Sequence, residues 1–413
     1  MKTKLKASAL FYALLVSVMI AMICTAMISM MYSYRFLAQN NQKLLQLITN
    51  VETGFSYLLQ QKTAKVGEQI IDLYQMQNDS IKLVTKTWGL FEVAQVQAFH
   101  QKQKMQKTAL LGYQQDRSTA LSVADGYRPL VLCGGTKLKG NVYRPRAGIK
   151  SASVGNIPYT GVNLVEGQSL LSLQQSPLDS ALLERRLNYL ESLTSHITSD
   201  VINEILLDSI YQSFNEEVLV LHKKNIHLKR HIQGQVIIKA DSLIKIHSNA
   251  VIENAVLLAP FVEIDEGFTG NLQIFASEKV KIHDNVYLKY PSVVSLSEAH
   301  QYSHTGFDIQ IGKGFRLEGL LLATRRANAP KIPKVKVESA QIMGDIFCIG
   351  ILDIRAQVNG SVSCSSFQLR LEGKTYNNYL LDTQINASRK PVAYLAPNYL
   401  LDKPKKGIVK WLN

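Results

Sequence analysis

The sequence predicts an α+β module followed by an all-β body: an N-terminal transmembrane helix with a small antiparallel sheet, then a parallel β-helix (β-solenoid) with an α-helical insert. Three observations predict this arrangement. Residues 7–34 contain no Asp, Glu, Lys, Arg or His. A five-residue unit with a central glycine recurs in the second part of the chain, and aliphatic residues recur every six positions within 246–264. Such recurrence is typical of stacked repeats.

Length and composition set the frame for these elements. The chain has 413 residues, a formal charge of +14, 46% apolar residues and 19% charged residues. These values exclude wholesale disorder and a collagen-like chain, and the length allows two or three domains. All 11 prolines lie at or after Pro129, and only five of the 24 glycines precede it. We therefore place a domain boundary near residue 125.

The first element is a membrane anchor. Lys2, Lys4 and Lys6 form a basic leader at 1–6, and the charge-free segment 7–34 follows. A helix of that length extends ~42 Å, more than the ~30 Å of a hydrocarbon core. A cleaved signal peptide is the alternative, but its apolar region is usually shorter. Because the basic residues precede the segment, we expect a single-pass inner-membrane protein with a cytoplasmic N-terminus and a periplasmic body.

The segment 35–125 is predicted to extend this helix and then to form strands. Leu44, Ile48, Val51 and Phe55 continue the apolar pattern at spacings of three and four, so one helix is expected from about residue 8 to 61. The stretches 80–87, 89–99 and 107–112 are rich in β-branched and aliphatic residues. They predict an antiparallel meander.

This N-terminal pattern resembles a known architecture. The basic KLKA leading directly into SALFYALLVSVMI, followed by a long helix and a small sheet, looks like type IV pilin-like proteins and pseudopilins over about 115 residues. The resemblance implies removal of the leader between Ala7 and Ser8, and packing with pilin-like or secretion-system proteins. Ala7 stands where those precursors usually have Gly, and Tyr12 stands where they usually have Glu. An ordinary single-span anchor remains the alternative.

The glycine unit reads apolar, any residue, Gly, polar, apolar. Its five copies are LKGNV, IQGQV, FTGNL, IMGDI and VNGSV, centred on Gly140, Gly234, Gly270, Gly344 and Gly360. We interpret each glycine as a tight corner, because glycine accepts positive φ and the flanking aliphatics can then point inward. The last two copies are 16 residues apart, which predicts a coil of about that length.

The six-residue period predicts the inner faces of coils. Ile246, Ile252, Leu258 and Ile264 form one series, and Ala250, Val256, Val262 and Phe268 form a second. We assign 126–175 to the first coils and 223–392 to the remainder, with aliphatics stacked inside. A two-layer strand sandwich is the alternative, but it favours hairpin turns such as Asn-Gly.

These coils resemble bactofilins and other polymer-forming β-helical proteins over roughly 120–165 and 230–390. Bactofilins repeat more regularly and mostly lack a long insert, so self-polymerisation is not carried over. The insert at 176–222 has leucines at helical spacing and predicts an αα-hairpin, which would act as a cap or as a docking arm. The end of the chain, 393–413, is a basic tail.

No residue is assigned a catalytic, cofactor-binding or metal-binding role, and the protein is not expected to be an enzyme. A hexapeptide-type acyltransferase would need a base such as His247, His283 or His300. A glycan-active lyase or hydrolase would need paired acids, for which the candidates are Glu263, Asp265, Glu266 and Asp284. Acids at turns are expected in any case for solvation.

The cysteines and lysines suggest a structural bridge and acidic partners. Cys348 and Cys364 hold equivalent positions in the last two glycine units, so a disulfide between them is a hypothesis, with a buried pair of thiols as the alternative. Outside the cytoplasm, the basic excess favours lipid headgroups, acidic glycans or acidic proteins over nucleic acid. We therefore expect a membrane-anchored structural or binding protein, pseudopilin-like, with a glycan-active or glycan-binding β-helix as the alternative.

Overall fold

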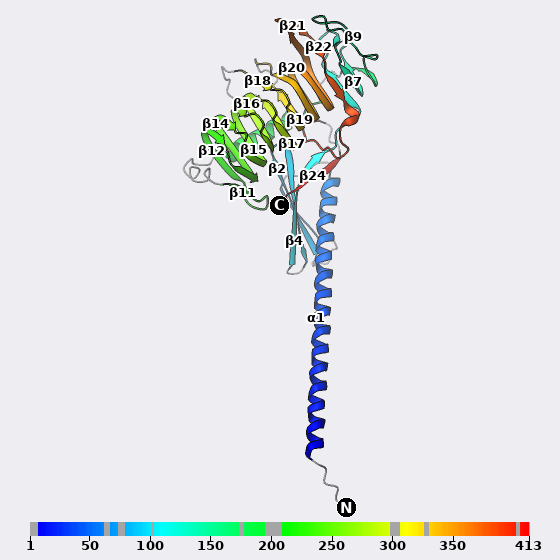
Figure 1. Ribbon diagram of the computed structural model, residues 1–413, viewed down its shortest axis with the longest axis vertical. Coiled ribbons are helices and arrows are strands. Elements are labelled where there is room, and N and C mark those ends of the chain that lie inside the picture. Colours follow the sequence, from blue (N-terminus) through cyan, green and yellow to red (C-terminus); the bar gives the residue numbers. More distant parts are fainter. Residues whose placement is uncertain are drawn as a thin grey trace, which may run out of the picture. The chain divides into compact units, whose positions relative to one another are not determined.

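The computed structural model describes residues 7–61, 67–72, 79–100, 103–172, 177–194, 209–297, 306–325, 330–401 and 405–412 (Figure 1). The chain forms two compact units. The first comprises Met1–Leu58, Glu68–Val84 and Val96–Lys107, and the second comprises Leu59–Gly67, Thr85–Gln95 and Thr108–Asn413. Four strands, β1, β2, β3 and β4, contribute residues to both units.

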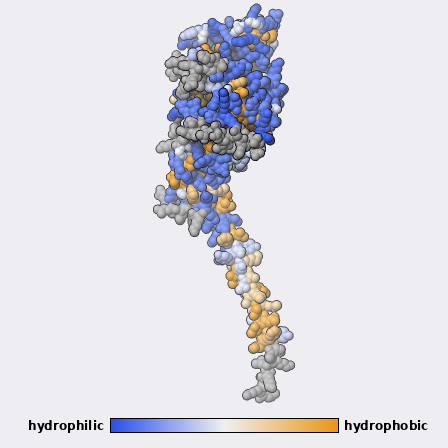
Figure 2. Space-filling model, turned by 90° about the vertical axis from the view of Figure 1, so that its left-hand side faces the viewer, coloured by the Kyte–Doolittle hydropathy of each residue, from blue (hydrophilic) through white to orange (hydrophobic). Residues whose placement is uncertain are grey.

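The first unit is built on one long helix, α1 (Ala7–Gln60), as the apolar pattern predicts. Its apolar side chains from Leu10 to Leu37 are largely exposed, and its most apolar stretch has a mean hydropathy of 2.4. Figure 2 shows hydrophobic residues gathered along this helix. By length and composition α1 can cross a membrane, although a signal sequence meets the same criterion.

The later turns of α1 are buried on one side. Leu47, Val51, Phe55 and Leu58 are each less than 5% exposed, at the spacing of a helix face. Gly54 lies on that face, where a Cβ would be only 2.6 Å from Val96 Cγ1. Glycine therefore allows the helix backbone to approach the strands closely.

A polar network joins the same part of α1 to two strands. The Asn50 amide, fully buried, donates to Asp79 Oδ1 at 3.1 Å and accepts from Gln46 Nε2 at 3.2 Å. Asp79 Oδ1 also lies 2.7 Å from His100 Nδ1. Because a buried amide needs such partners, this network fixes the rotation of α1 on the strands.

The antiparallel sheet has the order β1-β2-β3-β4-β24. Its strands are β1 (Gly67–Asp72), β2 (Asp79–Trp88), β3 (Phe91–His100), β4 (Gln103–Tyr113) and β24 (Lys406–Leu412). Two residues separate β2 from β3, and two separate β3 from β4, which only antiparallel neighbours allow. Neither edge strand was part of the predicted meander: residues 67–72 form β1, and the basic tail supplies β24, antiparallel to β4.

The remaining strands all belong to the second unit. They are β5 (Thr119–Val123), β6 (Leu130–Cys133), β7 (Lys137–Lys139), β8 (Asn141–Arg144), β9 (Ile149–Ser151), β10 (Ser169–Leu171), β11 (Ile210–Gln212), β12 (Leu219–Leu228), β13 (His231–Gly234), β14 (Val236–Ile246), β15 (Val251–Ile264), β16 (Thr269–Ile282), β17 (Tyr287–Ser297), β18 (Asp308–Ile311), β19 (Arg316–Thr324), β20 (Lys334–Leu371), β21 (Lys374–Asn377), β22 (Tyr379–Leu381) and β23 (Gln384–Asn386).

Most of these strands pair in parallel with a strand further along the chain. Ile246 lies beside Ile264, and Ile264 lies beside Ile282, so the register advances by 18 residues, three times the predicted period of six. All three side chains are buried in the main apolar cluster. A strand-rich body with parallel sheets is therefore confirmed. The spacing of 16 is not general, because equivalent residues on later strands, Ser292, Gly319 and Gly344, are 27 and 25 apart.

The two predicted aliphatic series divide between two cores. Ile246, Ile252 and Ile264 lie in the main cluster, whereas Val256 and Leu258 belong to a second cluster. The reason is local: β15 shifts register on both sides of 255–259, and strand alternation then turns Val256 and Leu258 outward. The expectation that all eight residues line one interior is wrong for these two.

Two segments distant in sequence complete one parallel ladder. Leu121 of β5 pairs with Val362 of β20, β8 pairs with β5, and β10 pairs with β8. In the same way β6 pairs with β22, and β7 with β23. Strands β5, β7, β8 and β10 therefore continue, in the same direction, the sheet that contains β11 to β20, whereas β6 and β9 form a separate three-stranded sheet with β22.

The predicted helical insert contains α2 (Ser180–Thr194), which begins where the Leu182 amide donates to Asp179 Oδ1 at 2.9 Å. Residues 195–208, where the second helix of the hairpin was expected, lie outside the described residues. Leu183 and Leu190 of α2 are buried in the second cluster with Trp88 and Phe91. Arg186, also buried, donates to the carbonyls of residues 90 and 91 and to Glu92 at 3.0 Å.

Candidate functional site

One sheet of the second unit carries a row of polar side chains on its outer face. The stretches 225–228, 243–246, 261–264, 279–282, 308–311 and 334–337 lie side by side in parallel register. Residues at alternate positions, such as Ile264 and Ile282, point into the core. Between them, one residue per strand forms the lateral polar row, which we define as His227, Lys245, Glu263, Lys281, Gln310 and Lys336.

Glu263 is the electrostatic centre of this row. His283 Nε2 lies 2.9 Å from its carboxylate, Lys281 Nζ donates at 3.0 Å, and Lys245 Nζ lies at 3.8 Å. The hydrogen bond from His283, with Lys281 and Lys245, lowers the pKa of Glu263 to about 2 against the opposing effect of burial. Glu263 is therefore a paired anion and not a general acid.

Asp265 forms a second cluster on the same face. Lys245 Nζ lies 3.2 Å from one carboxylate oxygen, and His247 Nδ1 lies 3.0 Å from the other. The hydrogen bond with Asp265 raises the pKa of Lys245. The His247 and His227 rings stack with their centroids 5.7 Å apart. Cross-strand ion pairs of this kind hold neighbouring strands in register.

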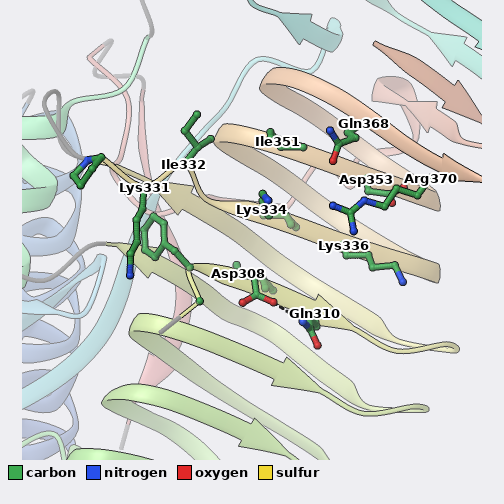
Figure 3. Close-up of a pocket in the computed structure, with 15 residues that line it drawn as sticks. Asp308, Gln310, Lys331, Ile332, Lys334, Lys336, Ile351, Asp353, Gln368 and Arg370 are labelled. Atoms are coloured by element: carbon green, nitrogen blue, oxygen red, sulfur yellow. Dashed lines mark hydrogen bonds between the residues drawn. The ribbon is translucent and has the colours of Figure 1, made fainter. Parts of the chain in front are cut away.

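A groove of about 750 Å³ lies at the β18 and β20 end of this face (Figure 3). Four strand segments contribute to it in order: Asp308 and Gln310, then Lys334 and Lys336, then Ile351 and Asp353, then Gln368 and Arg370. Lys331 and Ile332 lie at one end in the same figure. The groove thus crosses the strands.

The groove contains two carboxylates in different environments. Asp308 Oδ2 accepts from Gln310 Nε2 at 2.5 Å. Burial raises the pKa of Asp353, and the nearby charges of Arg355 and Lys336 partly offset that effect. Lys336 Nζ lies 2.7 Å from Glu338, whose pKa this contact lowers. The groove therefore combines cations with polar groups that accept hydrogen bonds.

The candidate acids and histidines of the sequence are dispersed. Four of them lie close together on the sheet face that carries the lateral polar row, which we call the lateral face: Glu263, Asp265, His247 and His283. Each carboxylate there is bonded to a cation or imidazole. Glu266 and Asp284 lie in turns, where Glu266 accepts from Asn285 and Asp284 accepts from the Lys313 backbone amide. His300 lies outside the described residues. Within the described ranges, no three His, Cys, Asp or Glu side chains are arranged to hold a metal ion.

Four of the five repeat glycines mark positions where strand backbones approach closely. A Cβ on Gly360 would lie 1.8 Å from the Gly344 carbonyl oxygen, and one on Gly344 would lie 2.0 Å from that of Gly319. Gly140 and Gly234 have φ of +124° and +101° beside the carbonyls of Ser118 and Gln212. Gly270 differs because its φ is not positive, although a Cβ there would still crowd the Ile252 carbonyl.

The cysteines are free thiols in the structure, so the hypothetical disulfide is not formed. Cys348 and Cys364 are both buried in the main cluster. Burial raises the pKa of the Cys348 thiol to about 12 and holds the pKa of Cys364 well above its usual value. The pair packs as two small apolar residues. Ala7 is the first residue of α1, so the proposed cleavage point between Ala7 and Ser8 lies at the helix start.

Two features were not found from the sequence. Gly319 continues the glycine column, but Leu320 follows it where the repeat has a polar residue, so the motif did not include it. The groove was missed because its side chains come from stretches far apart in sequence. The spacing of Lys334 and Lys336, two apart on one strand, was its only local signal. No protein-family model, curated protein or solved structure matches this chain.

Proposed function

We propose that this protein is a membrane-anchored, extracytoplasmic binding protein in which α1 is the anchor and the second unit is a β-solenoid that presents the groove to a partner. The observation that carries the proposal is a 750 Å³ groove with four cationic side chains, in a chain that begins with a long exposed apolar helix. Parallel pairing at a spacing of 18 residues over 243–246, 261–264 and 279–282 supports the solenoid.

The anchor also supports a pseudopilin-like role in an envelope filament or secretion assembly. A pilin-like helix would be apolar where it crosses the inner membrane and amphipathic where it packs on its own sheet. The exposed side chains from Leu10 to Leu37 and the buried ones from Leu47 to Leu58 follow that division. Processing between Ala7 and Ser8 would distinguish this role from a plain anchor.

Membrane extraction tests the anchor. The wild-type protein should stay in the pellet after alkaline carbonate treatment, with its body open to protease added outside the inner membrane. Met19→Lys/Ile23→Lys should release it, because each lysine near the middle of a span costs about 2.5–3.5 kcal/mol. Tyr57→Lys, in the same helix beyond its most apolar part, is the control and should leave the protein in the pellet.

Mass spectrometry of the native N-terminus distinguishes three alternatives for the N-terminal segment: a processed pilin-like helix, an unprocessed anchor and a removed signal sequence. A start at Ser8 supports the pseudopilin-like role, and a start at Met1 supports a plain anchor. A start beyond residue 34 identifies a removed signal sequence and contradicts anchoring.

A glycan-active enzyme is the second candidate, and Asp353 favours it. Its carboxyl is half-buried in the groove with a raised pKa, as a general acid requires. Release of reducing ends or of unsaturated products from a polysaccharide, lost in Asp353→Asn, would establish this alternative.

A further inference from the structure

We propose that the groove binds an acidic polysaccharide, with Lys334, Lys336 and Arg370 pairing with its carboxylates; this inference rests on the proposed function. The presence of cations, carboxylates and amide side chains together in the groove carries it.

The charge of the groove selects an anion. Its lining includes four cations, Lys331, Lys334, Lys336 and Arg370, against the two carboxylates Asp308 and Asp353. Lys334, Lys336 and Arg370 are exposed. Lys336 is paired with Glu338 at 2.7 Å, whereas the Arg370 guanidinium forms no ion pair within the described part of the chain. Arginine can form two parallel hydrogen bonds with a carboxylate.

The remaining side chains favour a sugar over a simple anion. Gln310 and Gln368 can both donate and accept, and Asp308 and Asp353 accept. These groups suit hydroxyls, which a uronic acid chain offers between its carboxylates. A ligand that offers only phosphate groups would supply no hydrogen-bond donors for the carboxylates of Asp308 and Asp353. Ile332, which is 45% exposed, and Ile351 offer apolar surface for the C–H face of a sugar ring.

The geometry favours a polymer. The groove crosses four neighbouring strand segments, and parallel strands are ~4.8 Å apart. Lys334 and Lys336 lie on one segment and Arg370 lies two segments further on. Cations on separate strand segments can each contact one of the anions that recur along a polymer chain. A volume of about 750 Å³ accommodates several sugar residues.

Calorimetric titration of the full-length protein in detergent micelles tests the inference. The probe is an oligogalacturonate, and its fully methyl-esterified form is the control ligand, since esterification removes only the charges. We expect binding of the free acid that weakens as salt is raised, and at least tenfold weaker binding of the ester.

Matched variants test the position of the site. Lys334→Glu/Arg370→Glu should weaken binding of the oligogalacturonate at least tenfold. Lys150→Glu/Lys239→Glu makes the same change in net charge outside the groove and should keep the affinity within about twofold. Both variants should give the far-ultraviolet circular dichroism of the wild type, because Lys334, Arg370 and Lys150 are exposed and Lys239 is only partly buried.

Four outcomes would overturn the inference: no binding of the free acid, equal binding of the ester, equal weakening in both double variants, or groove-dependent binding to anionic phospholipid vesicles but not to the oligosaccharide. Cleavage of the probe would replace binding by catalysis as the role of the groove. The carbonate extraction described above reads out the anchor independently, so failure of the glycan assay and failure of the proposed function are distinguishable.

Discussion

At the scale of single residues, Gly344 explains why glycine recurs in this sequence. Its φ is +140°, and the space of a Cβ is filled by the Gly319 carbonyl oxygen of the neighbouring strand. Gly344 lies within the continuous strand β20, so it is a point of close backbone approach and not a corner between two strands. The repeat predicted the positions, and the structure supplies this reason for them.

Gly344→Ala should therefore destabilise the second unit. A methyl group 2.0 Å from a carbonyl oxygen must push two strands apart, and a strained backbone position alone costs about 1–3 kcal/mol. We expect the free energy of unfolding to fall by the corresponding amount. The measurement is a lower urea midpoint, followed by circular dichroism in detergent. Gly126→Ala is the control, since nothing lies within 4 Å of its Cβ position, and it should be neutral. Equal midpoints for the two variants would contradict the close approach.

At the scale of the element, cross-strand charges link the strands of the lateral face. Glu263 on β15 contacts Lys281 on β16, His283 in the turn after it, and Lys245 on β14. One carboxylate thus connects three successive strands. Since its side chain is 17% exposed, its contribution is larger than that of an ordinary surface pair.

This arrangement predicts a dependence of stability on pH. The pKa of Glu263 is lowered in the folded state, so its stabilising effect is present above the unfolded pKa of about 4.5 and disappears as the pH falls through about 2. Glu263→Gln should lower the free energy of unfolding at pH 7 by on the order of 1–2 kcal/mol, after allowance for solvent screening.

Urea titrations at intervals between pH 7 and pH 2.5 measure this effect. The difference in free energy of unfolding between Glu263→Gln and the wild type should stay the same down to about pH 4.5 and should narrow as the pH falls further. Glu266→Gln, whose carboxylate accepts from Asn285 and not from a cation, is the matched control and should follow the wild type. A difference that is constant with pH would show that the ion pairs do not stabilise the fold.

At the scale of the whole second unit, the ladder is assembled from chain segments in an order unlike that of the sequence. In space, the sheet begins at β11 and runs to β20. Strands β5, β8 and β10, which come earlier in the sequence, extend it beyond β20. The segment containing α2 connects the two ends of this order. Its buried Arg186 bonds to Glu92 and to the carbonyls of residues 90 and 91. These bonds attach the connecting segment to the second apolar cluster.

An engineered disulfide tests the join between β5 and β20. Ser122 and Ser363 are direct partners in the parallel register, and both side chains are partly exposed. Parallel neighbours lie within disulfide range. Ser122→Cys/Ser363→Cys should therefore form a bond on mild oxidation, seen as faster migration on a non-reducing gel.

The control for this crosslink is Ser122→Cys/Ser151→Cys, because Ser151 pairs with Leu132 in another sheet. It should stay reduced. Three of the native cysteines are buried and should not interfere. Equal crosslinking of the two variants would contradict the pairing.

Much of the second unit was predictable because burial leaves a periodic trace. The six-residue period of Ile246, Ile252 and Ile264 indicated inner faces, and five glycine units indicated stacked strands. The outward direction of Val256 and Leu258 was not predictable, because a register shift within β15 gives no signal in composition. Of the candidate acids, Glu263 and Asp265 proved to be partners in ion pairs, whereas Glu266 and Asp284 accept hydrogen bonds in turns.

By itself, the sequence determined the long apolar helix, the three central strands of the sheet that follows it and the parallel character of the body. Each depends on residues close together in the chain, where hydropathy and spacing act directly. Only the tertiary structure decided that residues 121 and 362 are neighbours, that the last strand joins β4, and that Asp308, Lys334 and Arg370 share a groove. Such contacts join positions with no common local pattern, and they form only when the buried faces of distant strands are packed together.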